Sequence, residues 1–92
     1  MTQDEEIQRA EAAKRIYNDP LFKEAMTLVR EEILRKWEAT PARDTDGREW
    51  LWLFHQASNK FENTFKEWLE TGKMAEIQKE QPSVFKRMRA AL

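Results

Sequence analysis

His55 is the only histidine in this 92-residue chain, so it is the first residue to consider for chemistry. A histidine that acts as a general base needs an orienting carboxylate and a nucleophile within reach. In the stretch "LFHQA" and beyond it, no acidic residue follows before Glu62. The chain also lacks the Glu-x-x-His pairs that di-metal helical bundles use. We therefore expect His55 to lie on the flank of a helix without a catalytic role.

The remaining residues that can do chemistry give no catalytic pattern. The chain has no cysteine, no glycine-rich phosphate loop and no Ser/His/Asp set. Its glutamates alternate with basic residues, and Glu31–Arg35 and Glu32–Lys36 have the spacing of ion pairs on a solvated helix face. We expect no enzyme activity, no metal site and no cofactor.

One stretch, "FKRMRAAL" at residues 85–92, mixes basic and apolar residues. It could dock on a partner or on a nucleic-acid backbone, although three positive charges give only weak, salt-dependent binding. The alternative that we favour is a terminal helix that packs on the rest of the chain, with its basic residues suited to a helix C-terminus. The candidate docking residues are Phe85, Lys86, Arg87, Met88 and Arg89.

Composition predicts the elements that must position these side chains. Two glycines, three prolines and an abundance of helix-forming residues predict an all-α protein. Sixteen basic and 17 acidic residues give a net charge of −1, which is not typical of a nucleic-acid binder. Neither a membrane span nor a signal peptide is evident. We expect a soluble protein that is neither secreted nor bound to a membrane.

Helix boundary signals divide the chain into segments. "NDP" places Asp19 at an N-cap and Pro20 at the first helical position of a helix over 20–39. Asp46 and Glu49 have capping-box spacing and predict a helix over 46–71, which Gly72 ends as a C-cap. A polar helix over 3–17 precedes these two helices, and short helices over 73–80 and from 84 onward follow them.

A connection of about six residues favours antiparallel packing of the two central helices. We expect one helical domain over 1–92. It comprises an N-terminal helix (1–18), a long antiparallel helical hairpin (20–72) and a C-terminal helical tail (73–92).

Apolar spacing predicts how this hairpin packs. Residues at steps of three and four form a core seam: Phe22, Met26, Val29, Ile33 and Trp37 on one helix, and Trp50, Phe54, Phe61 and Phe65 on the other. Leu51, Trp52, Leu53 and Trp68 lie off this seam or at its edges, and we predict them at a protein interface. A small hairpin cannot cover so many aromatic side chains alone, so we expect a homo-oligomeric helical bundle. Terminal helices folded over the hairpin, or a different partner protein, are the alternatives.

Three stretches resemble short helical proteins encoded by tailed bacteriophages and prophages. They are "YNDPLFKEAM", "LRKWEATPARDTDGREWLW" and "ETGKMAE", and the resemblance covers roughly residues 16–77. It implies a gene in a head-assembly or DNA-packaging module, other virion or packaging proteins as partners, and a location in the host cytoplasm or the virion. Trp50, Trp52 and Phe54 depart from the pattern, where fewer aromatic residues are expected.

These observations favour a non-enzymatic assembly protein that acts by self-association and protein–protein contacts in virion assembly or genome packaging. One alternative is a DNA-binding packaging subunit similar to a small terminase. It requires nucleic-acid binding, which the near-neutral composition does not favour. Another is a regulator that docks on a host protein through exposed aromatic residues.

Overall fold

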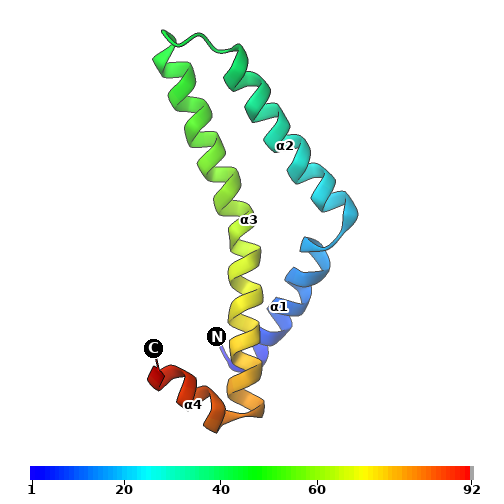
Figure 1. Ribbon diagram of the computed structural model, residues 1–92. Coiled ribbons are helices and arrows are strands. Elements are labelled where there is room, and N and C mark those ends of the chain that lie inside the picture. Colours follow the sequence, from blue (N-terminus) through cyan, green and yellow to red (C-terminus); the bar gives the residue numbers. More distant parts are fainter. Residues whose placement is uncertain (92) are drawn as a thin grey trace. The chain divides into compact units, whose positions relative to one another are not determined.

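The computed structural model describes residues 1–91, apart from the side chains of Val84 and Phe85. In this part of the chain all regular structure is helical, which confirms the all-α prediction. The helices are α1 (Gln3–Tyr17), α2 (Pro20–Ala39), α3 (Thr45–Glu80) and α4 (Pro82–Ala91) (Figure 1).

Local capping residues fix the starts of α1 and α2. Thr2 and Glu5 form a reciprocal capping box, in which Glu5 N donates to Thr2 Oγ1 at 3.1 Å and Thr2 N donates to Glu5 Oε1 at 3.2 Å. Asp19 caps α2 by accepting from Leu21 N at 2.8 Å, and Pro20 takes the first helical position. The predicted start of α2 is thereby confirmed.

Asp44, rather than Asp46, caps α3. Its Oδ1 accepts from Gly47 N at 3.0 Å, and its carbonyl accepts from Arg48 N at 3.1 Å. The predicted capping box of Asp46 and Glu49 is therefore wrong by two residues. Asp44 is the N-cap because it directly precedes the first helical turn, and its short side chain reaches the unpaired N–H groups there.

Gly72 does not end α3, which continues to Glu80. A glycine C-cap usually adopts a positive φ, and no glycine of this chain does. A methyl group at Gly72 would lie 2.1 Å from Ala10 Cβ and 3.2 Å from the Glu6 carbonyl oxygen. The predicted break after Thr71 is wrong, since this glycine serves close approach of two helices.

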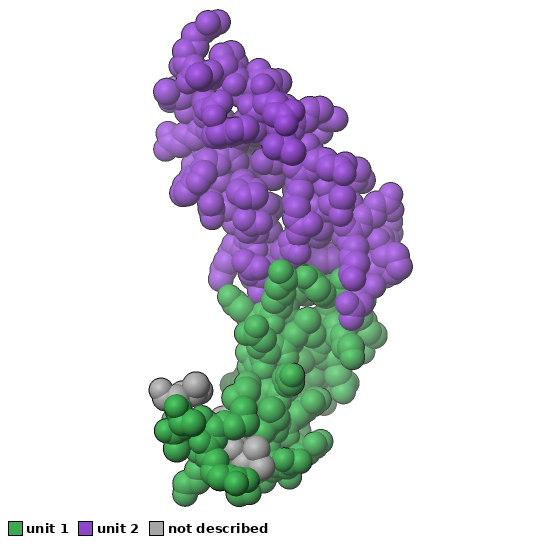
Figure 2. Space-filling view, in the orientation of Figure 1, with its two compact units in different colours: residues 1–17, 64–92 green, residues 18–63 purple. Residues whose placement is uncertain are grey.

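The chain forms two compact units, residues 1–17 with 64–92 and residues 18–63 (Figure 2). We call them unit 1 and unit 2. Unit 1 contains α1, the C-terminal part of α3 and α4. Its buried apolar residues are Ala13, Phe65 and Ala75, and Lys79 Nζ lies 2.5 Å from Asp4 Oδ1. Small side chains therefore make the closest packing between α1 and α3.

Unit 2 contains α2 and the N-terminal part of α3 side by side (Figure 1). Near the connecting loop, the Arg48 guanidinium lies 3.7 Å from the ring centroid of Trp37. Far from the loop, the rings of Phe22 and Phe61 are 6.3 Å apart. Both pairs join α2 to the N-terminal part of α3. We refer to these two helix segments as the helix pair.

Candidate interaction surfaces of the helix pair

The interior of the helix pair is small. Only three large apolar side chains of unit 2 are buried, namely Met26, Ile33 and Leu51. Nine others are more than one-third exposed. They are Leu21, Leu28, Leu34, Trp37, Trp50, Trp52, Leu53, Phe54 and Phe61.

The predicted core seam is only partly inside the chain. Its buried members are Met26, Ile33 and Phe65, and Phe22 and Val29 are half-buried. The remaining members are exposed in the chain, in contradiction to the prediction. They are Trp37, Trp50, Phe54 and Phe61.

Leu51 explains this difference. It was predicted at an interface, but it is only 5% exposed and lies against α2. Successive helical residues are about 100° apart, so turning Leu51 inward turns Trp50 to the flank. The prediction aligned the largest side chains with α2, whereas the helix pair places a leucine there and keeps its helices close.

The exposed side of α3 carries a continuous apolar surface, which we call the aromatic stripe: Trp50, Leu53, Phe54, Ala57 and Phe61. These positions follow helical spacing and include no charged residue. The rings of Trp50 and Phe54 stack at 5.4 Å with an interplanar angle of 5°, although they are 57% and 43% exposed. The stripe is thus a preformed aromatic surface open to contact.

A second apolar surface lies on another side of the helix pair. It is a groove of about 300 Å³, which we call the groove. Trp52, a predicted interface residue, lines the groove and remains 55% exposed. Arg48 covers Trp37 beside it and donates from Nη1 to the Thr40 carbonyl at 3.3 Å. The groove is lined by Arg30, Ile33, Leu34, Trp37, Leu51, Trp52 and His55.

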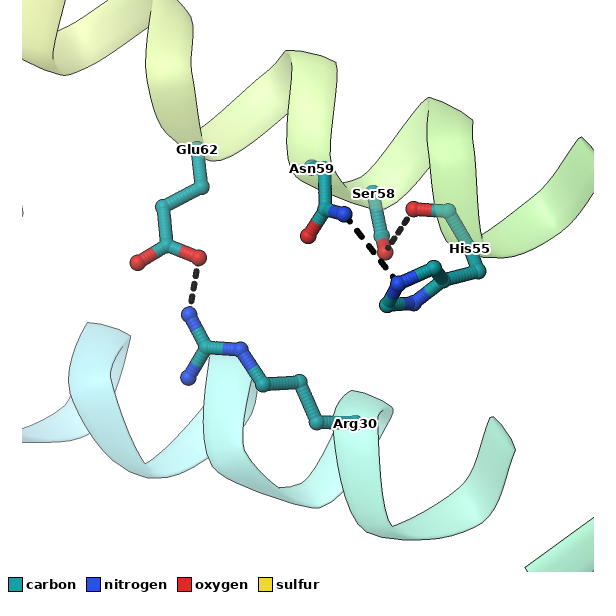
Figure 3. Close-up of polar contacts among 5 residues, drawn as sticks. All are labelled: Arg30, His55, Ser58, Asn59 and Glu62. Carbon is teal, nitrogen blue, oxygen red and sulfur yellow. Dashed lines mark hydrogen bonds and ion pairs between the residues drawn. The ribbon is translucent and has the colours of Figure 1, made fainter. Parts of the chain in front are cut away.

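Polar contacts near the groove hold its side chains in place (Figure 3). Arg30 forms an ion pair with Glu62 across the helix pair. His55 Nε2 lies 3.2 Å from Asn59 Nδ2, and the Ser58 hydroxyl donates to the His55 carbonyl at 2.9 Å. An amide N–H can only donate, so His55 accepts in this contact. His55 is therefore held by an amide, with no orienting carboxylate among these contacts.

The other predicted site residues belong to unit 1. Trp68 is half-buried in unit 1, where Arg9 covers its ring at 5.2 Å and Phe65 meets it edge-on at 5.6 Å. On α4, the side chains of Lys86, Arg87, Met88 and Arg89 are exposed. The predicted packing of Met88 is therefore not observed in the chain, and the prediction for Phe85 lies outside the described side chains. In the described residues, no three His, Cys, Asp or Glu side chains gather where a metal ion could bind.

Sequence reasoning missed Arg30 and Leu34 as surface-forming residues. Both line the groove, but in the sequence Leu34 lies off the apolar spacing series and Arg30 lies among charged residues. The sequence indicates this position of Leu34, because around the helix it lies about 100° from Ile33, a member of the predicted core seam. Such a residue marks a flank rather than a seam.

Comparison with known proteins adds no relative. No protein-family model matches the chain, and neither a curated protein nor a solved structure matches it. Through residues 1–91, no helix combines the length with the apolar composition that a membrane span needs.

Proposed function

We propose that this chain is a non-enzymatic helical assembly protein that acts by self-association. In this proposal, α2 and α3 form a helical hairpin, and the aromatic stripe of one copy packs against that of a second copy. The product is a helical bundle, in which paired hairpins supply the shared interior that one hairpin lacks. The observation that carries the proposal is the exposed, stacked pair of Trp50 and Phe54 within an uncharged stripe.

The exposed apolar area supports an interface of ordinary size. The exposed fractions of the five exposed aromatic residues in unit 2 amount to about two and a half whole side chains. At about 150–250 Å² each, they expose roughly 400–600 Å². The four exposed leucines add to this area, and a stable complex buries about 800 Å² on each partner. Unit 2 therefore carries enough apolar surface for a stable contact. The stripe supplies the part that belongs to Trp50, Leu53, Phe54 and Phe61, and other sides of the helix pair supply the rest.

The chemistry of the stripe favours a second copy of the chain. Surfaces between identical subunits are more apolar than other interfaces, and charged residues are rare at their centres. Trp50, Phe54 and Phe61 supply the large aromatic groups that dominate binding energies. Ala57 lies among them and is small enough to let a second helix approach closely.

The resemblance to phage proteins supports a role in virion assembly or genome packaging. A small helical protein with an apolar stripe could join other virion or packaging proteins in the host cytoplasm or the virion. The exposed basic residues of α4, Lys86, Arg87 and Arg89, favour the alternative of a DNA-binding packaging subunit. Their small number makes that alternative the weaker one.

The test is the molar mass of two variants in solution. Trp50→Glu places a charge in the stripe, whereas Gln56→Glu places the same charge on another exposed side of α3. Because Trp50 is more than half exposed in the chain, we expect Trp50→Glu to keep its helical circular dichroism. Light scattering should show it at a smaller multiple of 11.1 kDa than wild type and Gln56→Glu. An unchanged mass for Trp50→Glu would contradict the proposal.

A further inference from the structure

The outer side of α2 carries a second exposed apolar feature, which we call the ridge: Leu21, Ala25 and Leu28. Leu21 and Leu28 are 72% and 57% exposed and lie two helical turns apart. Helical spacing places Glu24 and Glu31 along one side of the ridge. Glu32 follows Leu28 one turn later, at the end of the ridge, and is ion-paired with Arg35 and Lys36. The ridge is therefore a short leucine surface with acidic residues along one side.

The ridge cannot fill the groove of its own chain. Leu28 is six residues from Leu34 and two from Arg30, both of which line the groove. At about 100° per residue, these side chains point roughly 120–160° away from Leu28 around α2. One chain can therefore present its ridge to one neighbour and its groove to another at the same time.

The two surfaces match in length and in volume. Leu21 and Leu28 are seven residues apart, and the groove lining on α2 also spans seven residues, from Arg30 to Trp37. Both spans are about 10 Å along a helix. A cavity of about 150 Å³ holds a molecule the size of benzene, so a groove of about 300 Å³ has room for two leucine side chains.

The two surfaces also match in charge. Arg30 lines the groove, and Arg48 lies over Trp37 at its side. Arg30 is ion-paired with Glu62. Glu24 and Glu31 border the ridge instead. A ridge-to-groove contact brings opposite charges together at its rim, whereas a groove-to-groove contact would bring arginines together.

From these matches we infer that the ridge of one copy binds in the groove of the next copy. The inference rests on the proposed self-association and adds a second contact to it. The ridge and the groove point about 120–160° apart around α2, so the same two copies cannot make this contact twice. The contact is therefore head-to-tail and does not close after two copies. Together with the aromatic stripe, it builds an assembly larger than a dimer.

The test uses one variant for each surface and a mixture of the two. Leu28→Glu damages the ridge and leaves the groove, and Trp52→Glu damages the groove and leaves the ridge. Both residues are more than half exposed, and circular dichroism verifies that each variant keeps its helices. Leu28→Gln and Trp52→Gln repeat the test without an added charge. Gln56→Glu, at an exposed residue of α3 outside the stripe and the groove lining, is the matched control.

We expect wild type and Gln56→Glu to exceed the mass of a dimer in light scattering. Each surface variant alone should fall to the dimer that the stripe supports. An equimolar mixture should regain a larger species, because the groove of Leu28→Glu can accept the ridge of Trp52→Glu. Restoration by mixing is specific to a head-to-tail contact, since a symmetric contact would stay broken in the mixture.

Unchanged masses for both variants, or a mixture that stays at the dimer mass, would overturn the ridge-to-groove contact. The stripe proposal would stand in that case if Trp50→Glu still gives a monomer. Conversely, a Trp50→Glu chain that keeps its full mass, beside Leu28→Glu and Trp52→Glu chains that lose mass, would support this contact and contradict the stripe. A wild-type chain that is monomeric at high concentration would overturn both.

Discussion

Replacing Gly72 by alanine should weaken unit 1, even though alanine is the better helix former. The new methyl group would lie 2.1 Å from Ala10 Cβ and 3.2 Å from the Glu6 carbonyl oxygen. Carbon atoms pack comfortably at about 3.5–4.0 Å. Neither neighbour is the end of a flexible side chain, so α1 has to move by more than about 1 Å.

Two opposing effects set the size of the change. In the interior of a helix, alanine is favoured over glycine by about 1 kcal/mol. Overpacking of a close contact costs about 1–3 kcal/mol. The buried Ala13 and Ala75 also lose contacts if α1 moves away. We therefore expect the free energy of unfolding to fall by up to about 2 kcal/mol.

Urea unfolding followed by circular dichroism measures this change, and hydrogen exchange in α1 locates it. The companion variant Ala10→Gly removes the clashing methyl group. Gly72→Ala combined with Ala10→Gly should therefore be more stable than the sum of the two single changes predicts, by about 1–3 kcal/mol. A Gly72→Ala chain that gains about 1 kcal/mol would refute the close approach of α1 to α3.

Other consequences can be measured on the same chain. Leu51 is 5% exposed and Leu53 is 53% exposed, so in a monomeric background Leu51→Ala should cost about 2–5 kcal/mol of stability and Leu53→Ala under about 1 kcal/mol. Equal losses of stability in urea unfolding would contradict the observed register of α3 against α2. Hydrogen bonds from the Thr2 backbone and hydroxyl groups lower the pKa of Glu5, so its capping contribution is complete above its unfolded pKa and is lost as pH falls through its folded pKa. The protection factors of amides in the first turn of α1 should fall in that acidic range, and Glu5→Gln should remove this pH dependence. An identical pH profile of protection in the variant would argue against the capping box. We expect no DNA binding in a gel-shift assay, either from the full-length chain or from a chain that lacks residues 81–92. A gel shift given only by the full-length chain would favour the DNA-binding alternative.

Local signals predicted the helix boundaries best. Asp19 and Pro20 act within two residues of themselves, and their roles in α2 follow from backbone chemistry alone. Thr2 and Glu5 carry an equally local signal for α1, the capping-box spacing. The predicted helix end at Gly72 is wrong because a glycine that ends a helix and a glycine that lets a neighbouring helix approach look the same in the sequence. Only the position of Ala10 distinguishes them.

The register of the helix pair depends on contacts between distant residues. On α3, Trp50 and Leu51 both begin acceptable apolar series, about 100° apart. The spacing of apolar residues does not decide which of the two series faces α2, because apolar residues occupy a wide arc of α3. Packing selects Leu51, and the aromatic residues then become the surface instead of the core. The candidate surfaces could therefore be suspected from the excess of aromatic residues, whereas their location required the structure.

The dependence of the melting temperature on protein concentration tests the self-association of this chain most directly. If folding and assembly are linked, a hundredfold rise in concentration stabilises a dimer by about 2.7 kcal/mol. For a dimer of this size, that corresponds to a rise of roughly 5–10 °C in melting temperature. We predict this rise for wild type and a smaller rise for Trp50→Glu, which keeps only the ridge-to-groove contact. A wild-type melting temperature that stays constant over that range would contradict self-association through the aromatic stripe.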